Sequence, residues 1–180
     1  MQFKKIISLA FLASFAIAFV ASSLLLSKTG ILPQCWMHLG RQVCIEQYNH
    51  DRDQQGFMEL FAQHHNALGA WDFEEELVSH EHTINVLRVK NQLAGFIVYK
   101  MLDDFHGHVD LLAIDKQCHG CGYGHTLLTH AMNELKNAGA QTISLKVYDD
   151  NEKAKRFYTN IGFTPKDSPG CLIEYAIKLA

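Results

Sequence analysis

The sequence predicts a mixed α/β fold, in which a central sheet is flanked by helices and is preceded by an apolar N-terminal helix. Residues 6–26 form an apolar run that contains nothing more polar than serine. From residue 42 to residue 179, strand-like apolar runs recur, and segments with helical periodicity separate them. Alternation of these two patterns is typical of a sheet that is covered by helices.

Residues 1–33 are predicted to attach the protein to a membrane. The apolar run 6–26 is about as long as a helix that crosses a bilayer, which needs roughly 20 residues. The alternative is a cleaved signal peptide, with 6–20 as its apolar core and the small residues 21–23 as its exit. Because residues 24–26 continue the apolar run, an uncleaved single-pass anchor is favoured, and export after cleavage is the alternative.

Residues 34–180 are predicted to form one domain. The chain has 16 Lys and Arg residues, 19 Asp and Glu residues and a formal net charge of −3. The charged residues of 1–33 are Lys4, Lys5 and Lys28, so residues 34–180 hold 13 basic and 19 acidic residues, a balance of −6. An acidic domain without clustered basic residues is poorly suited to nucleic acid. About 145 residues are enough for one core but not for two.

The first elements of the domain are one strand and two helices. Val43 and Ile45 lie on one side of an alternating run that predicts a strand over residues 42–48. Apolar residues at helical spacing predict a helix over residues 51–69, which Gly69 ends. A second short helix is predicted over residues 71–80.

Three strands follow. The runs 83–89 and 93–100 are separated by residues 90–92, which predicts an antiparallel hairpin. The run 109–114 is almost continuously apolar, interrupted only by Asp110, as expected for a strand that is buried on both faces.

Two helices and two strands complete the domain. They are predicted as helix 124–138, strand 142–148, helix 150–161 and strand 171–179. Asp149 and Glu152 form a capping-box pattern that predicts the start of the second helix.

The five cysteines are predicted to be free thiols or small core residues, because their odd number and their spacing fit no disulfide framework. They are Cys35, Cys44, Cys118, Cys121 and Cys171.

The segment that is most informative for function joins the run 109–114 to the helix 124–138. Between them, Gly120, Gly122 and Gly124 occupy alternate positions. Such a loop lets backbone amides approach an anion closely at a helix N-terminus, and the expected ligand is a phosphate or pyrophosphate. The alternative is a purely structural turn, because the spacing matches neither a dinucleotide fingerprint nor a nucleotide P-loop.

A second motif, Asn-x-x-Ala-x-x-x-Tyr-x-x-x-Gly-Phe, follows at residues 151–163. Together with residues 112–128 it resembles the GCN5-related N-acetyltransferase (GNAT) superfamily. Members of that family show Leu-Ala-Val-Asp-Pro-x-x-Arg/Gln-Gly-x-Gly-x-Gly-x-x-Leu-Leu, with which residues 112–128 align without a gap. The resemblance runs from about Val43 to the C-terminus. It implies a GNAT-like fold and transfer of an acetyl group from acetyl-coenzyme A to a primary amine.

The resemblance also implies where acetyl-coenzyme A binds as a co-substrate. The pyrophosphate would lie on the amides of the glycine loop, and the pantetheine arm would pair with the exposed end of the preceding strand. Asn151 would contact the cofactor or position Tyr158, with helix capping as its structural alternative. The residues expected to bind the cofactor are Leu112, Ala113, Ile114, His119, Gly120, Cys121, Gly122, Tyr123, Gly124, His125 and Asn151.

Two catalytic residues are implied in the same way. Tyr158 would be the general acid for the leaving thiolate, because a phenol has a pKa of about 10; its structural alternative is a core aromatic. His108 would be the general base for the amine, because histidine titrates near neutrality, although a strand histidine is often structural. His106 and Asp110 lie beside it in the sequence. No metal is expected.

Two positions depart from the family pattern and open alternative functions. His119 replaces an Arg or Gln and Cys121 replaces a frequent basic residue, which removes positive charge and predicts weaker cofactor binding. The same changes create Cys118-x-x-Cys121 before a helix, where disulfide oxidoreductases lower a thiol pKa. An exported thiol-disulfide oxidoreductase is therefore one alternative, and a catalytically degenerate coenzyme A-binding module is another. Zinc binding by the two cysteines with His119 or His125 would lack a second Cys-x-x-Cys pair.

The sequence leaves the acceptor and the compartment open. The acidic balance favours a cationic acceptor, such as a lysine side chain, a protein N-terminus or a polyamine. The resemblance places acceptor specificity in residues 51–82 and 164–170. Lys4 and Lys5 before the apolar run favour a domain outside the cytosol, by a small margin. Acetyl-coenzyme A is expected mainly inside it.

Overall fold

An eight-stranded sheet organises the chain in the computed structural model, which describes residues 34–38, 40–64, 82–166 and 170–179. The strand order is β1-β2-β3-β4-β5-β6-β8-β7. The strands are β1 (Gln34–His38), β2 (Arg41–Gln47), β3 (Thr83–Val89), β4 (Gln92–Asp103), β5 (His106–Ile114), β6 (Thr142–Tyr148), β7 (Thr164–Lys166) and β8 (Leu172–Lys178). β5 and β6 run parallel, whereas β2–β3, β3–β4, β4–β5, β6–β8 and β7–β8 are antiparallel pairs.

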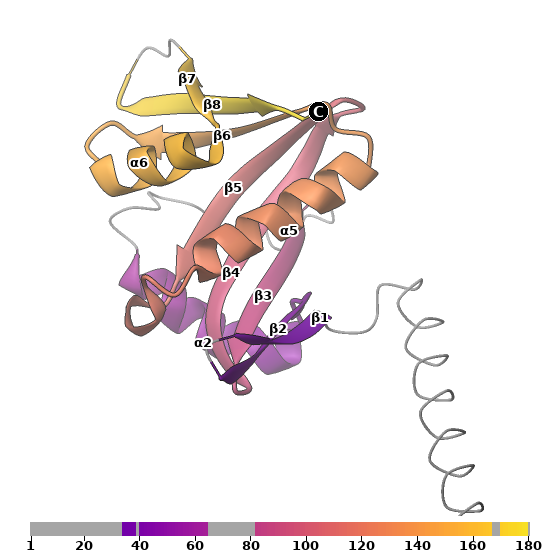
Figure 1. The fold of residues 1–180 in the computed structure, drawn as a ribbon, viewed down its shortest axis with the longest axis vertical. Coiled ribbons are helices and arrows are strands. Elements are labelled where there is room, and N and C mark those ends of the chain that lie inside the picture. The colour runs from indigo at the N-terminus through magenta and orange to yellow at the C-terminus, as the bar shows by residue number, and fades with distance from the viewer. Residues whose placement is uncertain (1–33, 39, 65–81, 167–169, 180) are drawn as a thin grey trace, which may run out of the picture. The chain divides into compact units, whose positions relative to one another are not determined.

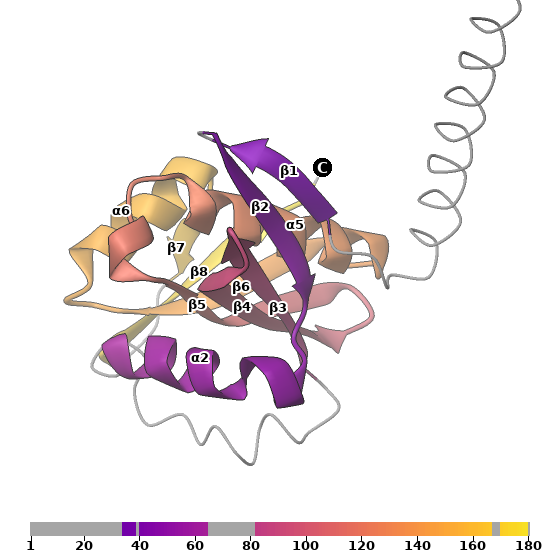
Figure 2. The same cartoon turned by 90° about the horizontal axis from the view of Figure 1, so that it is seen from below.

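Helices cover both faces of this sheet (Figure 1, Figure 2). They are α2 (His50–Gln63), α5 (Tyr123–Asn137) and α6 (Glu152–Ile161), and a 3-10 turn, η1 (Lys116–Cys118), precedes α5. On one face, Phe57 and Leu60 of α2 pack in a cluster with Leu111 of β5. On the other face, Leu127 of α5 and Tyr158 of α6 share a larger cluster with β5 and β6. The predicted mixed α/β fold, with helices on a central sheet, is confirmed.

Most of the predicted elements occur, with differences at their ends. Strands 83–89 and 142–148 coincide with β3 and β6, but the hairpin turn is shorter than predicted, because Lys90 and Asn91 alone make it with φ values of 51° and 67°. α2 ends at Gln63, before the predicted residue 69. β1 and β7 were not predicted, because both are short and lack a clear alternation.

Several predictions concern segments that the structure does not describe. The second short helix, 71–80, and the apolar run 6–26 both lie outside the described residues. None of the helices within residues 34–38, 40–64, 82–166 and 170–179 is both long and apolar enough to cross a membrane. The membrane anchor therefore stays a prediction.

The predicted capping box at the start of α6 is wrong. Asn151, not Asp149, is the N-cap, and its Oδ1 accepts a hydrogen bond of 3.0 Å from the backbone N–H of Ala154. Asp149 instead forms an ion pair of 3.2 Å with Lys155. The chain turns for two more residues after β6 than the capping-box pattern assumed, since the backbone N–H of Asn151 bonds to the carbonyl oxygen of Tyr148, so the cap falls on Asn151.

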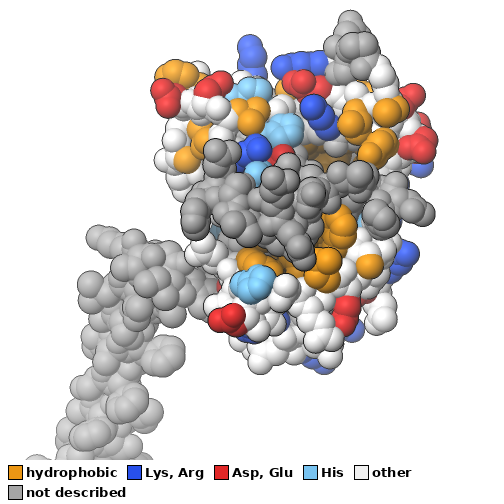
Figure 3. Space-filling model, turned by 180° about the vertical axis from the view of Figure 1, so that it is seen from behind, with side chains coloured by type: hydrophobic (Ala, Val, Ile, Leu, Met, Phe, Trp, Pro, Cys, Tyr) orange, Lys and Arg blue, Asp and Glu red, His pale blue; other side chains and the backbone are white. Residues whose placement is uncertain are grey.

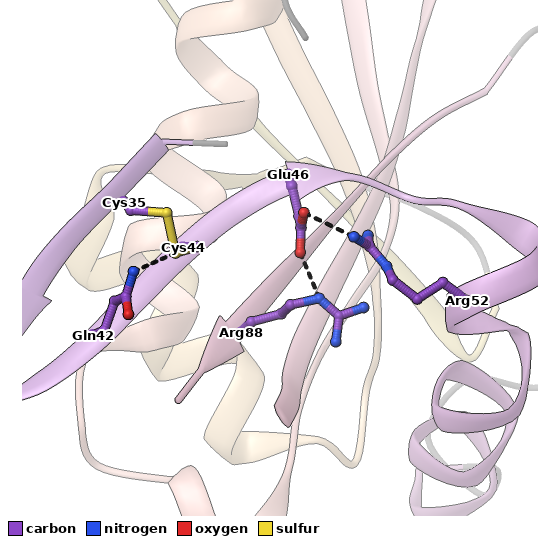
Figure 4. Close-up of a disulfide and its surroundings, with 6 residues drawn as sticks. All are labelled: Cys35, Gln42, Cys44, Glu46, Arg52 and Arg88. Atoms are coloured by element: carbon purple, nitrogen blue, oxygen red, sulfur yellow. Dashed lines mark hydrogen bonds and ion pairs between the residues drawn. A yellow bond between two sulfur atoms is a disulfide. The ribbon is translucent and has the colours of Figure 1, made fainter. Parts of the chain in front are cut away.

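The expectation of five free cysteines is also wrong. Cys35 of β1 and Cys44 of β2 form a disulfide, with their Cα atoms 4.0 Å apart (Figure 4). The neighbouring strands bring together two cysteines that nine positions separate in the sequence, and that pairing depends on the unpredicted β1. Cys118, Cys121 and Cys171 are free thiols.

Ion pairs attach the N-terminal end of α2 to the sheet. Asp53, which is 1% exposed, bonds to Arg52 and to Arg88 of β3. Both arginines also pair with Glu46 of β2 (Figure 4). Burial acts to raise the pKa of Asp53, but the hydrogen bond from Arg52, the backbone N–H of Asn49 and the two arginine charges outweigh it and lower that pKa. The buried carboxylate thus holds the first turn of α2 against β2 and β3.

Two features of β5 shape the site. Val98 of β4 pairs with Leu111, but the next residue, Tyr99, pairs with Val109, so Asp110 is an extra residue in a β-bulge. The ladder between β5 and β6 ends with Val109 paired to Leu145. Beyond that pair the two strands separate (Figure 1). The second half of β5 therefore has one edge paired to β4 and its other edge turned away from β6.

Candidate active site

A cavity of about 510 Å³ lies where β5 and β6 separate. The end of β5, the glycine loop, the first turn of α5 and α6 with its N-cap supply its walls, and His64 after α2 completes them. The lining residues are His64, Leu112, Ala113, Ile114, Cys118, His119, Gly120, Gly122, Tyr123, Gly124, His125, Asn151, Lys153, Ala154, Phe157 and Tyr158. Every predicted cofactor residue except Cys121 is in this set, and so is Tyr158.

The glycine loop presents the N-terminus of α5 to the cavity. Gly120 and Gly122 have φ values of 78° and 81°, in the left-handed region that other residues adopt only with strain. Gly122 is the N-cap of α5, and no side chain among the described residues caps the helix. The first turn contains no acidic residue, so its free N–H groups and the positive end of the helix dipole are available to an anion.

Three basic side chains gather beside this loop. His64 and His119 each place Nε2 2.9 Å from the carbonyl oxygen of Ile114. Lys153, in the first turn of α6, has its Nζ atom 3.0 Å from Nδ1 of His119. When both histidines donate from Nε2, the Nδ1 atom of His119 can accept from the lysine ammonium. This lysine restores positive charge that the glycine loop itself lacks.

Sequence reasoning missed His64 and Lys153 because they come from other elements than the glycine loop. His64 is the C-cap of α2. Lys153 follows the motif residue Asn151 by two positions, so a basic residue in the first turn of that helix was the available signal. Burial, as the largest effect, lowers the pKa of His64, and the nearby charges of His119, Lys116 and Lys153 lower it further; its bond to Ile114 acts in the opposite direction.

Cys121 was predicted to bind the cofactor but does not line the cavity. Its side chain packs against the core cluster under α5, and its carbonyl oxygen is 2.9 Å from Nε2 of His38 in β1. The glycine on each side of it has a positive φ, which turns the chain so that Cys121 faces the core. Burial and the neighbouring Asp115 raise the pKa of Cys118, which is the opposite of what a reactive thiolate requires.

Tyr158 is both a core aromatic and a wall of the cavity. It is 9% exposed, and its ring makes edge contacts with Phe157 and Phe163 at centroid distances of 5.0 and 5.8 Å. Burial raises its pKa above the ordinary value, so the phenol keeps its proton throughout the neutral range. Asn151, seven residues earlier, caps α6 and also lines the cavity.

His108 does not lie in this cavity. Its Nδ1 is 2.7 Å from the hydroxyl oxygen of Ser144 in β6, and its Nε2 is 3.9 Å from Oδ1 of Asp110. Burial, the largest effect, lowers the pKa of His108, although the charge of Asp110 opposes this. A neutral imidazole near pH 7 is the form that can accept a proton. Within the described ranges no three His, Cys, Asp or Glu side chains converge on a metal position.

Comparison with known proteins identifies similar sequences and folds. The profile of the acetyltransferase (GNAT) family matches residues 45–163. A mycothiol acetyltransferase of Actinosynnema mirum is 34% identical over 74 residues, 41% of this chain and 25% of the relative. The [ribosomal protein bS18]-alanine N-acetyltransferase of Haemophilus influenzae is 35% identical over 77 residues, 43% of this chain and 51% of the relative. The chain thus spans a quarter to about half of the length of these relatives.

Solved structures share the fold. The PaiA N-acetyltransferase of Thermoplasma acidophilum, in complex with coenzyme A, superposes with a TM-score of 0.65 at 18% identity, over 76% of this chain and 99% of that one.

Proposed function

The chain belongs to the acetyltransferase (GNAT) family, and from this premise we propose that it transfers the acetyl group of acetyl-coenzyme A to an amine. The cavity at the separated ends of β5 and β6 carries the proposal. It joins three features that a long ligand with an anionic centre needs: a helix N-terminus that no described side chain caps, a strand end whose second edge pairs with no described strand, and an apolar wall that contains Tyr158.

The residues of the cavity suit the parts of acetyl-coenzyme A in order. The amides of residues 123–125 would hold the pyrophosphate, and Lys153 would add positive charge beside it. The backbone of Leu112 and Ala113, on the unpaired edge of β5, would pair with the pantetheine arm. When bound, acetyl-coenzyme A supplies the activated acetyl thioester.

Tyr158 would hold the proton that the departing thiolate needs. Its raised pKa keeps the phenol protonated before transfer, and a thiolate produced in the same buried cavity is itself made more basic by desolvation. Asn151 would fix the start of α6, and with it the position of Tyr158, through its cap to Ala154.

The acceptor class is proposed as a primary amine: a protein N-terminus, a lysine side chain or a small-molecule amine. The acidic balance of residues 34–180 supports a cationic acceptor. The printed activity of the Haemophilus influenzae relative is acetylation of a protein alanine, which is one member of this class.

The two rival functions have less support. A thiol-disulfide oxidoreductase would need a thiolate at Cys118, but burial raises the pKa of that thiol. A degenerate coenzyme A-binding module would have no use for a tyrosine in the cavity wall, yet Tyr158 is present there.

We also propose the division of the chain into an anchor, residues 1–33, and a catalytic domain, residues 34–180. The length of the apolar run 6–26 supports the anchor. The lysines before the run and the disulfide between Cys35 and Cys44 support a domain outside the cytosol, where disulfides persist. The need for acetyl-coenzyme A supports the cytosolic side. Protease accessibility of the domain in intact cells decides between the two sides.

The function is tested by following release of coenzyme A from acetyl-coenzyme A by the full-length protein. The acceptor panel contains peptides with a free α-amine, peptides with a free lysine and blocked N-terminus, and polyamines. We expect release to depend on one of these acceptors and the product to gain one acetyl group by mass spectrometry. Reduction of insulin disulfides, with no acetylated product from any acceptor, would support the rival oxidoreductase.

A further inference from the structure

The bulged strand β5 places two histidines on the face of the sheet that lies opposite α5. A Cβ added to Gly107 would lie 2.9 Å from Leu135 of α5, and Val109 shares the core cluster of that helix. His106 and His108 alternate with these residues, so their side chains point to the other face. Figure 3 views that face and shows histidine side chains gathered beside acidic and basic ones.

One buried hydroxyl joins the two histidines. Ser144 of β6 is 2% exposed, and its Oγ lies 2.7 Å from Nδ1 of His108 and 2.9 Å from Nε2 of His106. A hydroxyl has one proton to donate and lone pairs with which to accept. It can therefore accept from Nδ1–H of His108 and donate to Nε2 of His106 at the same time, which leaves Nε2 of His108 without a proton.

His108 stands at the point where β5 and β6 separate. It is one residue before Val109, which forms the last pair of the β5–β6 ladder. The cofactor cavity begins on the other side of the same opening, with Leu112 as its first lining residue on β5. An amine that reaches the opening from the face of His108 would meet the thioester from the side opposite Tyr158.

The hydrogen bonds that start at His108 end at His106, which borders a second cavity. His106 lines a space of about 490 Å³ together with Asp103 and Asp104, both of which are exposed. The path from the opening to this cavity therefore consists of His108, Ser144 and His106, with hydrogen-bond distances at both steps.

We propose that His108, Ser144 and His106 form a proton exit route that carries the proton of the acceptor amine to the second cavity. This proposal rests on the proposed acetyltransferase function. His108 accepts the amine proton at Nε2 and gives its Nδ1 proton to Ser144. The hydroxyl proton of Ser144 passes to Nε2 of His106, which releases a proton from Nδ1 to water. One proton enters and one leaves, with no oxidant or reductant.

The charges around His108 suit a transient imidazolium. The titratable and charged side chains that act on it are Asp110 and His106 on β5, Lys100 on β4 and Lys146 on β6. Asp110 is the anion among them, 3.9 Å from Nε2 of His108, and its other oxygen lies 3.5 Å from Nε2 of His82. The lysines and burial keep His108 neutral at rest, and Asp110 stabilises the charge when the amine proton arrives.

The hydrogen bonds of the route are tested without any acceptor, by NMR of the histidine ring nitrogens in the full-length protein. We expect neutral His108 to carry its proton on Nδ1, which is the less common tautomer, and to change to Nε2 in Ser144→Ala. Ser144→Thr retains the hydroxyl and should retain the tautomer. If neutral His108 carries its proton on Nε2 in both the wild type and Ser144→Ala, the route is overturned.

Its role in transfer is tested with the acceptor found in the coenzyme A release assay. We expect His106→Gln to lower kcat about tenfold with an unchanged KM, and added imidazole, which can enter the second cavity, to restore it. The control His130→Gln removes a histidine of α5 outside both cavities and should match wild type. A His106→Gln enzyme with wild-type kcat refutes the route alone. A wild-type protein that releases no coenzyme A with any acceptor refutes the proposed function, and the route falls with it.

Discussion

Tyr158 is the side chain on which the proposed chemistry depends at the scale of single residues. We expect Tyr158→Phe to lower kcat about 100-fold or more, because general acid catalysis contributes roughly that factor. Binding of acetyl-coenzyme A should be almost unchanged, since the ring that packs on Phe157 and Phe163 is retained. Coenzyme A release and calorimetric titration measure the two quantities. A variant with wild-type kcat would show that Tyr158 is only a core aromatic.

His108 gives the rate its expected dependence on pH. Burial holds the pKa of His108 below its ordinary value of about 6.5. A base acts only when unprotonated, so kcat/KM should rise with pH through that lowered pKa and be level before pH 7. His108→Gln should remove this acidic limb and lower the plateau about 100-fold. An acidic limb that persists unchanged in His108→Gln would assign it to another group.

The glycine loop is the element whose backbone prepares the anion site. Gly122 has φ of 81°, so Gly122→Ala should cost about 1–2 kcal/mol of strain, although a Cβ there meets no described atom within 4 Å. Because the strain falls on the N-cap of α5, we expect acetyl-coenzyme A to bind more weakly by calorimetry.

Gly56→Ala is the matched control for this change. Gly56 lies inside α2, where an added Cβ would meet Leu93 at an ordinary 3.7 Å. The substitution should leave binding unchanged and raise stability by up to about 1 kcal/mol, through the helix propensity of alanine. Equal affinities of both variants would mean that the loop conformation does not determine binding.

The attachment of α2 predicts how stability changes with pH. Because the folded-state pKa of Asp53 is lowered, its stabilising contribution is complete above its unfolded pKa of about 3.9 and is lost as pH falls through the folded value. Asp53→Asn leaves Arg88 and Arg52 without their buried partner and should cost about 3–5 kcal/mol at pH 7. Urea unfolding should show that the difference in unfolding free energy between wild type and Asp53→Asn becomes smaller below pH 4. A difference that is constant with pH would contradict the ionic role of Asp53.

The elements show what could be predicted from the sequence and what could not. In residues 109–128, local sequence patterns indicate an apolar strand, a glycine loop and a helix. The cavity walls that these residues form could therefore be predicted from the sequence. The disulfide depends on a strand pairing with β1, a strand too short to give a signal. The bulge at Asp110 depends on the register with β4 and decides which face each histidine of β5 occupies. The alternation of apolar and polar residues along one strand does not reveal its register with a neighbouring strand.

At the scale of the whole molecule, the site exists because distant elements meet at one opening in the sheet. β5 and β6 separate, α5 and α6 line the opening on one face, and the histidines of β5 occupy the other. Lys153 shows the consequence, since a residue of α6 completes a site that begins in the loop before α5. The overall charge is acidic, so this local basic group matters for an anionic ligand.

Titration of acetyl-coenzyme A into the full-length protein by calorimetry tests most directly that this cavity is the cofactor site. We predict binding at one site, weakened about tenfold or more by Lys153→Glu, since the reversed charge would face the pyrophosphate at the proposed site. Lys178→Glu, an equal charge change on an exposed position of β8, should match wild type. No heat at millimolar acetyl-coenzyme A, or equal affinity of wild type and both variants, would contradict the account.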